Sequence, residues 1–271
     1  MHDNKMRTEI LTIDKGQCLT DVLPAIPANT IFDKTITGCG ATHSEIVNAA
    51  RHSIIIEPNI PVILGKKAEH PFLFAVYEGI TKEDVKAYLA GEHDGYRKII
   101  TTPEGFDKKV LPAMHELEIP VYKDYFLLFD ECEKAIQDVG YRGDIYLPVE
   151  DFFKFENKAM VSATPIVPSD PRFEENGFKI LKLVPTYDSR IELTLCTTNN
   201  TVAVMRKLLK RLENETVCVF LNSTETILSL IYALRLQGRS RVFCSEKSVR
   251  KLKQMLSLIH ISEPTRLLSI S

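Results

Sequence analysis

Long hydrophobic runs are missing from this 271-residue chain. A membrane-spanning helix needs about 20 consecutive, mainly apolar residues, and no stretch of the sequence meets that requirement. The N-terminus, MHDNKMRTEI, is polar and lacks the apolar centre of a secretory signal. We therefore expect a cytoplasmic protein with no membrane partner.

Cysteine and histidine are not grouped in the ways that bind metal. The six cysteines are scattered without a CxxC pair, and the seven histidines complete no zinc-binding spacing. We therefore expect neither structural zinc nor disulfide bonds. The cysteines are Cys18, Cys39, Cys132, Cys196, Cys218 and Cys244.

A large excess of one charge is also absent, since the formal net charge is -2. The charge is uneven, however. Residues 191–255 hold 11 Lys and Arg against 5 Asp and Glu, whereas residues 1–190 hold 22 against 30. The basic stretch that includes Arg206, Lys207, Lys210 and Arg211 could meet nucleic-acid phosphates, or it could be an ordinary solvated helix face.

The C-terminal segment 256–271, LSLIHISEPTRLLSIS, resembles the translation of a sequencing-library adapter. We expect it to be non-native, with the natural sequence interrupted near Met255. The alternative is a native amphipathic tail.

Short apolar or β-branched runs alternate with helical stretches along the chain. This alternation favours βαβ units, in which a crossover helix joins two parallel strands. We therefore predict an α/β fold with a parallel sheet. Strands are expected at 31–32, 53–57, 72–77, 98–102, 125–129 and 159–163, and helices at 41–51, 81–90 and 103–117.

Three prolines between residues 165 and 171, followed by Glu174–Gly177, predict a surface connection. The alternation then restarts, with strands expected at 191–196, 217–221 and 241–244 and helices at 201–212, 224–236 and 246–255. About 65 residues are too few for a complete domain of this kind. We divide the chain into a lead-in (1–28), an α/β domain (29–188), an incomplete second α/β domain (189–255) and the tail.

A glycine-rich turn, TGCGATHSE, runs from Thr37 to Glu45. The order strand, glycines, helix is that of a phosphate-binding loop, where backbone N–H groups and the helix dipole attract an anion. Gly38 and Gly40 allow a close backbone approach, and the Thr42 hydroxyl is placed to hold Mg²⁺. A helix N-terminus would also lower the pKa of Cys39 and could make the thiol reactive, but we expect Cys39 to be an incidental small residue.

The turn departs from the GxxxxGK[ST] pattern because Ala41 stands at the lysine position. A charge lost about 4 Å from a phosphate forfeits roughly 4 kcal/mol at an effective dielectric of 20. Lys34, at the end of the preceding strand, could supply the charge if the loop folds back. The alternative is a plain strand-to-helix connection in which Thr42 and Glu45 form a capping box.

Two acids follow the most apolar run, in YFLLFDECEK. Ligands bind at the carboxyl ends of strands in an open parallel sheet. Asp130 could therefore coordinate Mg²⁺, and Glu131 could deprotonate an attacking water, although Asp130 could instead cap the next helix. We expect the glycine turn and this acid pair to come from neighbouring strands and to face each other across a gap of triphosphate size.

The segment MVSATP adds Ser162 and Thr164 at the next strand end. A phosphate loop, a DExx box and S-A-T, in this order, resemble the first RecA-like domain of superfamily-two DEAD/DEAH-like helicases and translocases. The resemblance covers roughly residues 29–255. It implies ATP and Mg²⁺ as cofactors, and it implies that Ser162 and Thr164 couple the nucleotide state to the nucleic-acid face.

Three further segments resemble motifs of this family. KIITTPEGF (98–106) resembles a segment that contacts nucleic-acid phosphates, which implies this role for Thr101 and Thr102. SIIIEPN (53–59) resembles an earlier strand-end motif, and VCVFLNST (217–224) resembles the opening strand of the second motor domain. The family's arginine finger is not visible in the sequence.

The predicted function is that of an ATP-dependent motor moving on DNA or RNA, with single-stranded nucleic acid as partner and Asp130 and Glu131 as catalytic residues. Hydrolysis is expected to be slow because half of the composite site is absent. One rival is a nucleotide- or nucleic-acid-binding module without hydrolysis, which Ala41 favours. The other is a different phosphate-loop enzyme, such as a small-molecule kinase, against which the S-A-T segment argues.

Overall fold

The computed structural model describes residues 6–132, 149–164, 170–189, 193–212, 214–243 and 260–262. The chain forms two compact units, Met1–Arg190 and Ile191–Ser271, and each is described separately.

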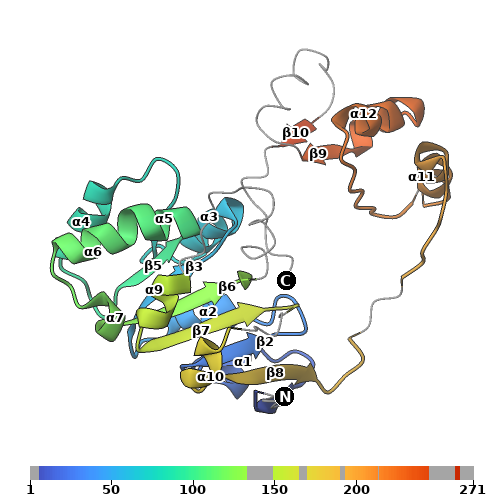
Figure 1. Ribbon diagram of the computed structural model, residues 1–271. Helices are drawn as coiled ribbons and strands as arrows, with labels where there is room; N and C mark the ends of the chain where they lie inside the picture. Colours follow the sequence, from blue (N-terminus) through green and yellow to red (C-terminus); the bar gives the residue numbers. More distant parts are fainter. Residues whose placement is uncertain are drawn as a thin grey trace. The chain divides into compact units, whose positions relative to one another are not determined.

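Unit 1 is built on a parallel sheet (Figure 1). The order across the sheet is β1-β8-β2-β7-β6-β3-β5-β4, and the paired strands are parallel throughout. All carboxyl ends therefore lie along one edge. The strands are β1 (Thr8–Ile13), β2 (Thr30–Asp33), β3 (His52–Ile56), β4 (Phe74–Val76), β5 (Lys98–Thr101), β6 (Tyr125–Asp130), β7 (Asn157–Ser162) and β8 (Lys179–Pro185).

Helices connect these strands and cover the sheet. A π-helical turn, η1 (Phe106–Val110), joins two of them, so that residues 103–116 form the continuous helical stretch predicted from the sequence. The helices are α1 (Leu19–Val22), α2 (Ala41–Val47), α3 (Ile60–Glu69), α4 (Lys82–Ala90), α5 (Pro103–Gly105), α6 (Leu111–Glu116), α7 (Val121–Asp124), α9 (Val149–Lys154) and α10 (Arg172–Glu175).

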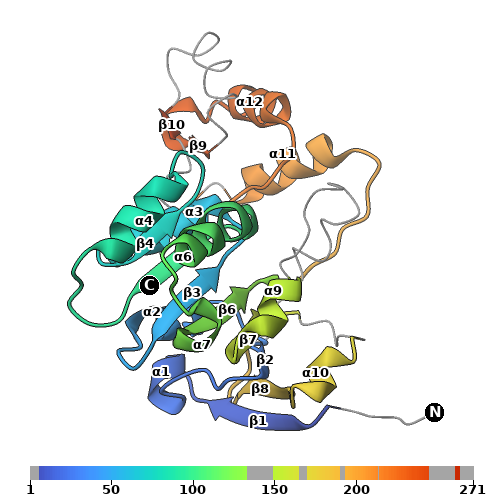
Figure 2. The ribbon, with the colours of Figure 1, turned by 60° about the vertical axis from the view of Figure 1, so that its left-hand side comes forward.

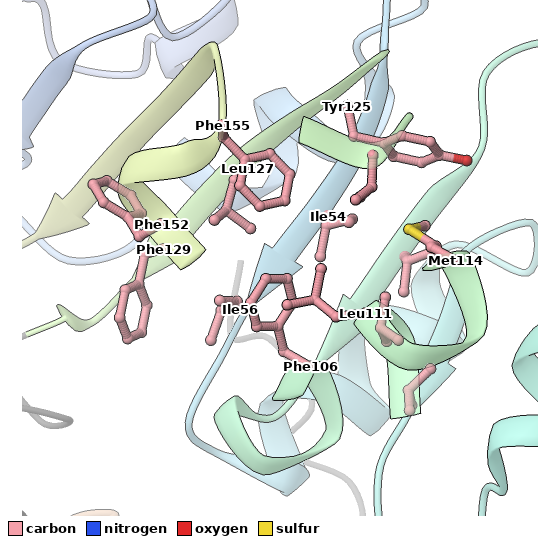
Figure 3. Packing of buried hydrophobic residues seen from close by; sticks show 14 of the residues in the cluster. Ile54, Ile56, Phe106, Leu111, Met114, Tyr125, Leu127, Phe129, Phe152 and Phe155 are labelled. Atoms are coloured by element: carbon pink, nitrogen blue, oxygen red, sulfur yellow. The ribbon is translucent and has the colours of Figure 1, made fainter. Parts of the chain in front are cut away.

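The core lies on both faces of the sheet because successive strand residues point to opposite sides. Ile54 and Ile56 pack in the cluster that contains residues of α4, η1 and α6, whereas Ile55 packs with residues of α1, α2 and α3. Figure 3 shows the first side, with Phe106 and Leu111 packed toward Ile54 and Ile56. Burial on both faces explains why the central strands are unbroken apolar runs.

The predicted α/β fold with a parallel sheet is confirmed. Helix α4 begins as predicted, since the Thr81 side chain accepts a hydrogen bond from the Asp84 N–H and the Asp84 carboxylate accepts one from the Thr81 N–H. Helix α2 ends at Val47 rather than at residue 51, because Asn48 adopts an extended conformation. Helix α3 was not predicted, although Asn59 and Pro61 stand at its start.

Two strands come from segments that the sequence analysis treated as connections. β1 lies in the lead-in, and β8 follows the proline-rich break. They pair with each other at one end of the sheet, and β8 also pairs with β2 (Figure 2). The lead-in also contacts the glycine turn, since the Leu19 N–H donates to the Cys39 carbonyl at 2.9 Å.

Unit 2 contains α11 (Thr201–Arg211), α12 (Thr224–Ala233), a 3-10 turn η2 (Gln237–Arg239) and a parallel pair, β9 (Arg241–Phe243) with β10 (His260–Ser262). The predicted strand at 217–221 is wrong, and so is the described part, 193–196, of the strand predicted at 191–196. A strand needs a partner for its backbone and a cover for its side chains. In the described part of the chain, residues 217–221 pair with no strand, and Phe220 is 93% exposed.

The remaining predictions in unit 2 divide between the described and undescribed residues. The helix predicted at 246–255 lies outside the described residues. The basic residues at 206, 207, 210 and 211 are exposed on α11, whose N-cap Asn200 accepts a hydrogen bond from the Ala203 N–H. No helix within the described ranges has the length and apolarity needed to cross a membrane.

Candidate functional site at the carboxyl ends of the strands

The glycine turn connects β2 to α2 through two residues in the left-handed backbone region. Gly38 has φ 75° and Gly40, the N-cap of α2, has φ 88°, a region that favours glycine. A Cβ added at either glycine would meet no atom within 4 Å, so open space adjoins the backbone there. The first N–H groups of α2 have no partner within the helix, as in any helix, and a helix N-terminus favours an anion, although the Ala41 N–H contacts the Cys39 thiol.

At this edge of the sheet, the Asp130 carboxylate contacts the side chains of both Lys34 and Thr42. The Lys34 Nζ lies 3.2 Å from Asp130 Oδ1, and the Thr42 hydroxyl donates to Asp130 Oδ2. The backbone N–H of Glu131 also donates to Asp130 Oδ1, at 2.9 Å. The Lys34 and Asp130 side chains are only 12% and 4% exposed. Both carboxylate oxygens of Asp130 are therefore occupied by donors from this chain.

The expectation that the glycine turn and the acid pair come from neighbouring strands is wrong. β7 lies between β2 and β6, with Asp33 opposite Ser162 and Asp130 opposite Val161. The two groups instead reach each other past the end of β7. Lys34 continues the pairing there, since its N–H donates to the Ser162 carbonyl at 2.9 Å. The side chains of Thr42 and Asp130 touch directly and leave no gap between them.

Lys34 remains positively charged despite its burial. Burial disfavours the ammonium ion, but the charge and hydrogen bond of Asp130, with the charge of Glu131, outweigh it and raise the pKa of Lys34. A cation is thus held at the mouth of the glycine turn, although residue 41 is alanine.

Two residues that the sequence analysis did not assign to the site complete it. Glu57 is 1% exposed, and its Oε1 accepts hydrogen bonds from both the backbone N–H and the side-chain Nδ2 of Asn59, each at 2.9 Å. The same Nδ2 donates to Glu131 Oε2 at 3.0 Å. The sequence feature that could have identified both residues is the polar segment EPN, which directly follows the buried strand SIII. Its side chains project at the same edge as Asp130.

Burial, together with the negative charges of Asp130 and Glu131, raises the pKa of Glu57 to about 7 against the lowering effect of the Asn59 donors. The folded chain therefore keeps a proton that the unfolded chain loses near pH 4.5. Unfolded Glu57 binds fewer protons than folded Glu57 in this interval, so we expect the free energy of unfolding to fall between about pH 4.5 and about pH 7. Glu57→Gln should remove this part of the pH dependence.

The measurement for Glu57 is urea denaturation followed by circular dichroism at pH 5 and pH 8, for the natural chain and for Glu57→Gln. If the variant loses as much stability between these pH values as the natural chain, Glu57 does not carry the buried proton.

Of the other predicted site residues, Ser162, Thr101 and Thr102 have hydroxyls that form hydrogen bonds within the chain. Ser162 is fully buried, and its Oγ accepts from the Thr164 N–H at 2.9 Å, while Thr164 is exposed. Thr101 is also fully buried. Thr102 caps α5, since its Oγ1 accepts from the Gly105 N–H at 3.0 Å. Their roles toward nucleic acid remain predictions.

Two alternatives considered for the turn, a reactive Cys39 and a capping box, are wrong. Burial raises the pKa of the Cys39 thiol and outweighs the lowering effects of the Ala41 N–H and of Lys34. The thiol is therefore not activated by the helix terminus. No capping box joins Thr42 and Glu45, because Gly40 is the N-cap and the Glu45 carboxylate is buried against Arg51.

The oxygen atoms at this site suit Mg²⁺. A hydroxyl and a carboxylate, those of Thr42 and Asp130, already touch, and magnesium takes few protein ligands together with phosphate oxygens and water. Within the described ranges, no three His, Cys, Asp or Glu side chains form a group that could hold a metal by themselves. A cation here would therefore require oxygen ligands from a bound phosphate as well.

The parallel sheet with helices on both faces is an α/β fold consistent with a RecA-like domain. Among solved structures, the chain is similar to the DUF1998 helicase MrfA, with 13% identity and a TM-score of 0.50, over 86% of this chain and 38% of MrfA. It also aligns with a hypothetical ATP-dependent RNA helicase from Sulfolobus tokodaii, with 12% identity and a TM-score of 0.39, over 90% and 76% of the two chains. The chain thus spans about 38% of the length of MrfA. It matches no protein-family model and no curated protein.

Proposed function

We propose that this chain is the ATP-binding part of a nucleic-acid-dependent ATPase motor of the helicase type. The observation that carries the proposal is the contact of Lys34, Thr42 and Asp130 beside the glycine turn. A cation, a hydroxyl and a carboxylate at the N-terminus of a helix are the groups that a triphosphate with Mg²⁺ requires.

Each residue has a separate task in this proposal. The backbone from Gly38 to Thr42 cradles the phosphates, and the Lys34 ammonium supplies the charge that Ala41 lacks. Thr42 and Asp130 would hold Mg²⁺, which neutralises charge on the phosphate oxygens when bound. When the nucleotide binds, the Lys34 ammonium group must then give up part of its contact with Asp130 and contact the phosphate instead.

Glu131 is the proposed base. It follows Asp130 with φ 48°, a left-handed conformation that is uncommon for a residue with a side chain. The carboxylate accepts a proton from a water that attacks the terminal phosphate. Ser162 and Thr164 would transmit the nucleotide state to a single strand of DNA or RNA at the same edge.

A second candidate function is a nucleotide- or nucleic-acid-binding module that does not hydrolyse ATP. Ala41 favours it, and so does the ion pair between Lys34 and Asp130, which occupies the proposed metal ligand. The two functions differ in turnover. The motor should show magnesium-dependent ATP hydrolysis that single-stranded DNA or RNA accelerates, whereas the binding module should show none.

Lys34→Ala tests the substitute lysine. We expect nucleotide affinity to fall at least about tenfold, because a positive charge close to a phosphate is lost. The measurement is calorimetric titration with a non-hydrolysable ATP analogue and Mg²⁺. The control is Lys66→Ala, which removes a cation paired with Glu69 on α3 and should leave affinity unchanged. Unchanged affinity in Lys34→Ala would show that Lys34 does not replace the missing lysine.

A further inference from the structure

Two hydrogen bonds hold the chain between neighbouring strands where β2 ends. The Lys34 N–H donates to the Ser162 carbonyl of β7 at 2.9 Å. On the other side, the Thr35 hydroxyl donates to the Leu183 carbonyl of β8. If the pairing of β2 with β8 continued beyond Asp33, this carbonyl would accept from the Thr35 backbone N–H. The hydroxyl therefore takes the place of a backbone donor at the end of the strand.

The Thr35 backbone departs from the strand conformation. Its φ is 40°, in the left-handed region, where a β-branched residue is an outlier. The Thr35 N–H donates to Asp33 Oδ1 at 3.1 Å instead of to β8. Such a conformation persists only where surrounding contacts hold it. The hydrogen bonds to Asp33 and Leu183 hold it here, so the chain leaves the sheet immediately after Lys34 and enters the glycine turn.

This turn fixes the backbone from which the Lys34 side chain extends. The Lys34 ammonium lies 3.2 Å from Asp130 Oδ1, and its side chain is 12% exposed. A lysine side chain is long and flexible, so the place of its charge depends on where its Cα is held. Resting on the proposed function, we propose that Thr35 is a positioning residue that holds Lys34 at the mouth of the glycine turn for the nucleotide phosphates. In this role the Thr35 hydroxyl donates its proton to Leu183 and not to a phosphate.

The binding test compares four forms of the full chain: the natural chain, Thr35→Val, Lys34→Ala and the double variant, each titrated with a non-hydrolysable ATP analogue and Mg²⁺. Valine keeps the shape of threonine but cannot donate to Leu183. We expect Thr35→Val to lower affinity about 3- to 10-fold, because a smaller fraction of the chain then holds Lys34 in place. In the Lys34→Ala background the same change should lower affinity less than about twofold, since the residue that Thr35 positions is already lost. Equal losses in both backgrounds would overturn the inference.

Two further variants separate positioning from damage to the fold. Thr30→Val is the matched control, because Thr30 begins β2 and its hydroxyl also donates to a carbonyl, that of Ala28, at 3.2 Å. Thr30 is fully buried, so this change should lower stability to urea without changing nucleotide affinity. Thr35→Ser keeps the hydroxyl and should bind the nucleotide like the natural chain. The inference fails if Thr30→Val lowers affinity as much as Thr35→Val, or if Thr35→Ser binds as weakly as Thr35→Val.

Hydrogen exchange of the nucleotide-free, ¹⁵N-labelled chain gives a second readout. In Thr35→Val the Lys34 amide should exchange faster relative to the Phe32 amide of the same strand, because the end of β2 opens locally. In Thr30→Val this ratio should stay at its natural value. An unchanged ratio in Thr35→Val would overturn the inference. If the ratio changes but the natural chain binds no nucleotide, the proposed function fails and the positioning role fails with it. If the natural chain binds nucleotide and Thr35→Val binds it equally well, only the inference fails.

Discussion

Replacing Glu45 with alanine is expected to lower the free energy of unfolding by about 3–5 kcal/mol, because the change leaves the buried Lys98 and the partly buried Arg51 without their counter-charge. Arg51 donates to both oxygens of Glu45, at 3.0 and 2.6 Å, and Lys98 Nζ lies 3.6 Å from Glu45 Oε1. Lys98 is 3% exposed, and burial with the charge of Arg51 lowers its pKa to about 8 even in the presence of Glu45.

The Glu45→Ala change should also affect the phosphate-binding loop. Glu45 belongs to α2. Ser53, which donates to Glu45, lies in β3, and Lys98 begins β5. The hydrogen bonds and ion pairs of Glu45 thus attach α2, the helix that contains Thr42, to the sheet. Urea denaturation followed by circular dichroism measures the stability change, and nucleotide titration measures the change at the loop.

The control for Glu45 is another glutamate that pairs with two cations. Glu116 contacts Lys82 and Lys86, but its side chain is 44% exposed. Glu116→Ala should therefore lower the stability much less than Glu45→Ala does, since water screens exposed ion pairs. Equal losses from Glu45→Ala and Glu116→Ala would show that burial does not decide the contribution of the network.

Glu131→Gln is expected to lower ATP turnover by about 100- to 10,000-fold, the usual contribution of a positioned acid–base group. Glutamine keeps the shape of the side chain and an oxygen that can accept from Asn59, but it cannot take a proton from water. Nucleotide affinity should remain, because Lys34, Thr42 and the glycine turn are unchanged. The measurement is steady-state hydrolysis with saturating single-stranded nucleic acid, together with titration of an ATP analogue.

Glu118→Gln is the matched control for this change. Glu118 also has a positive φ, 53°, and its side chain is exposed away from the described site residues. It should hydrolyse ATP like the natural chain. If Glu131→Gln retains full turnover while Glu118→Gln behaves normally, the base is another group and the mechanism proposed for Glu131 is wrong.

The site was predictable where its residues follow strong local patterns. Apolar runs that end in acids place Asp130 at the carboxyl edge of a parallel sheet, and glycines before a helix place Thr42 at the same edge. The local sequence suggested that Lys34 folds back toward the glycine turn, but it could not establish this position. It depends on Asp130, 96 residues away, which supplies the charge that holds the ammonium there.

Glu57 and Asn59 could not be assigned from the sequence, because their importance comes from Glu131, 72 residues beyond Asn59. The strand β1 escaped prediction for the same reason. Its partner β8 is about 170 residues away, and a short strand at the end of a sheet has a weaker apolar pattern than a central one. In unit 2 the sequence predicted a strand that the structure does not contain. Residues 217–221 have the composition of a strand, but they pair with no strand in the described residues.

The sequence by itself determined the fold class and the edge on which the site lies, because strand and helix periodicity and the polar residues that end each strand are local properties. Only the tertiary structure decided which of those polar residues meet. Strand order interposes β7 between the glycine turn and the acid pair, and it brings Asn59 to Glu131. The physical reason is that hydrogen bonds and ion pairs act over a few ångströms in space, regardless of separation along the chain.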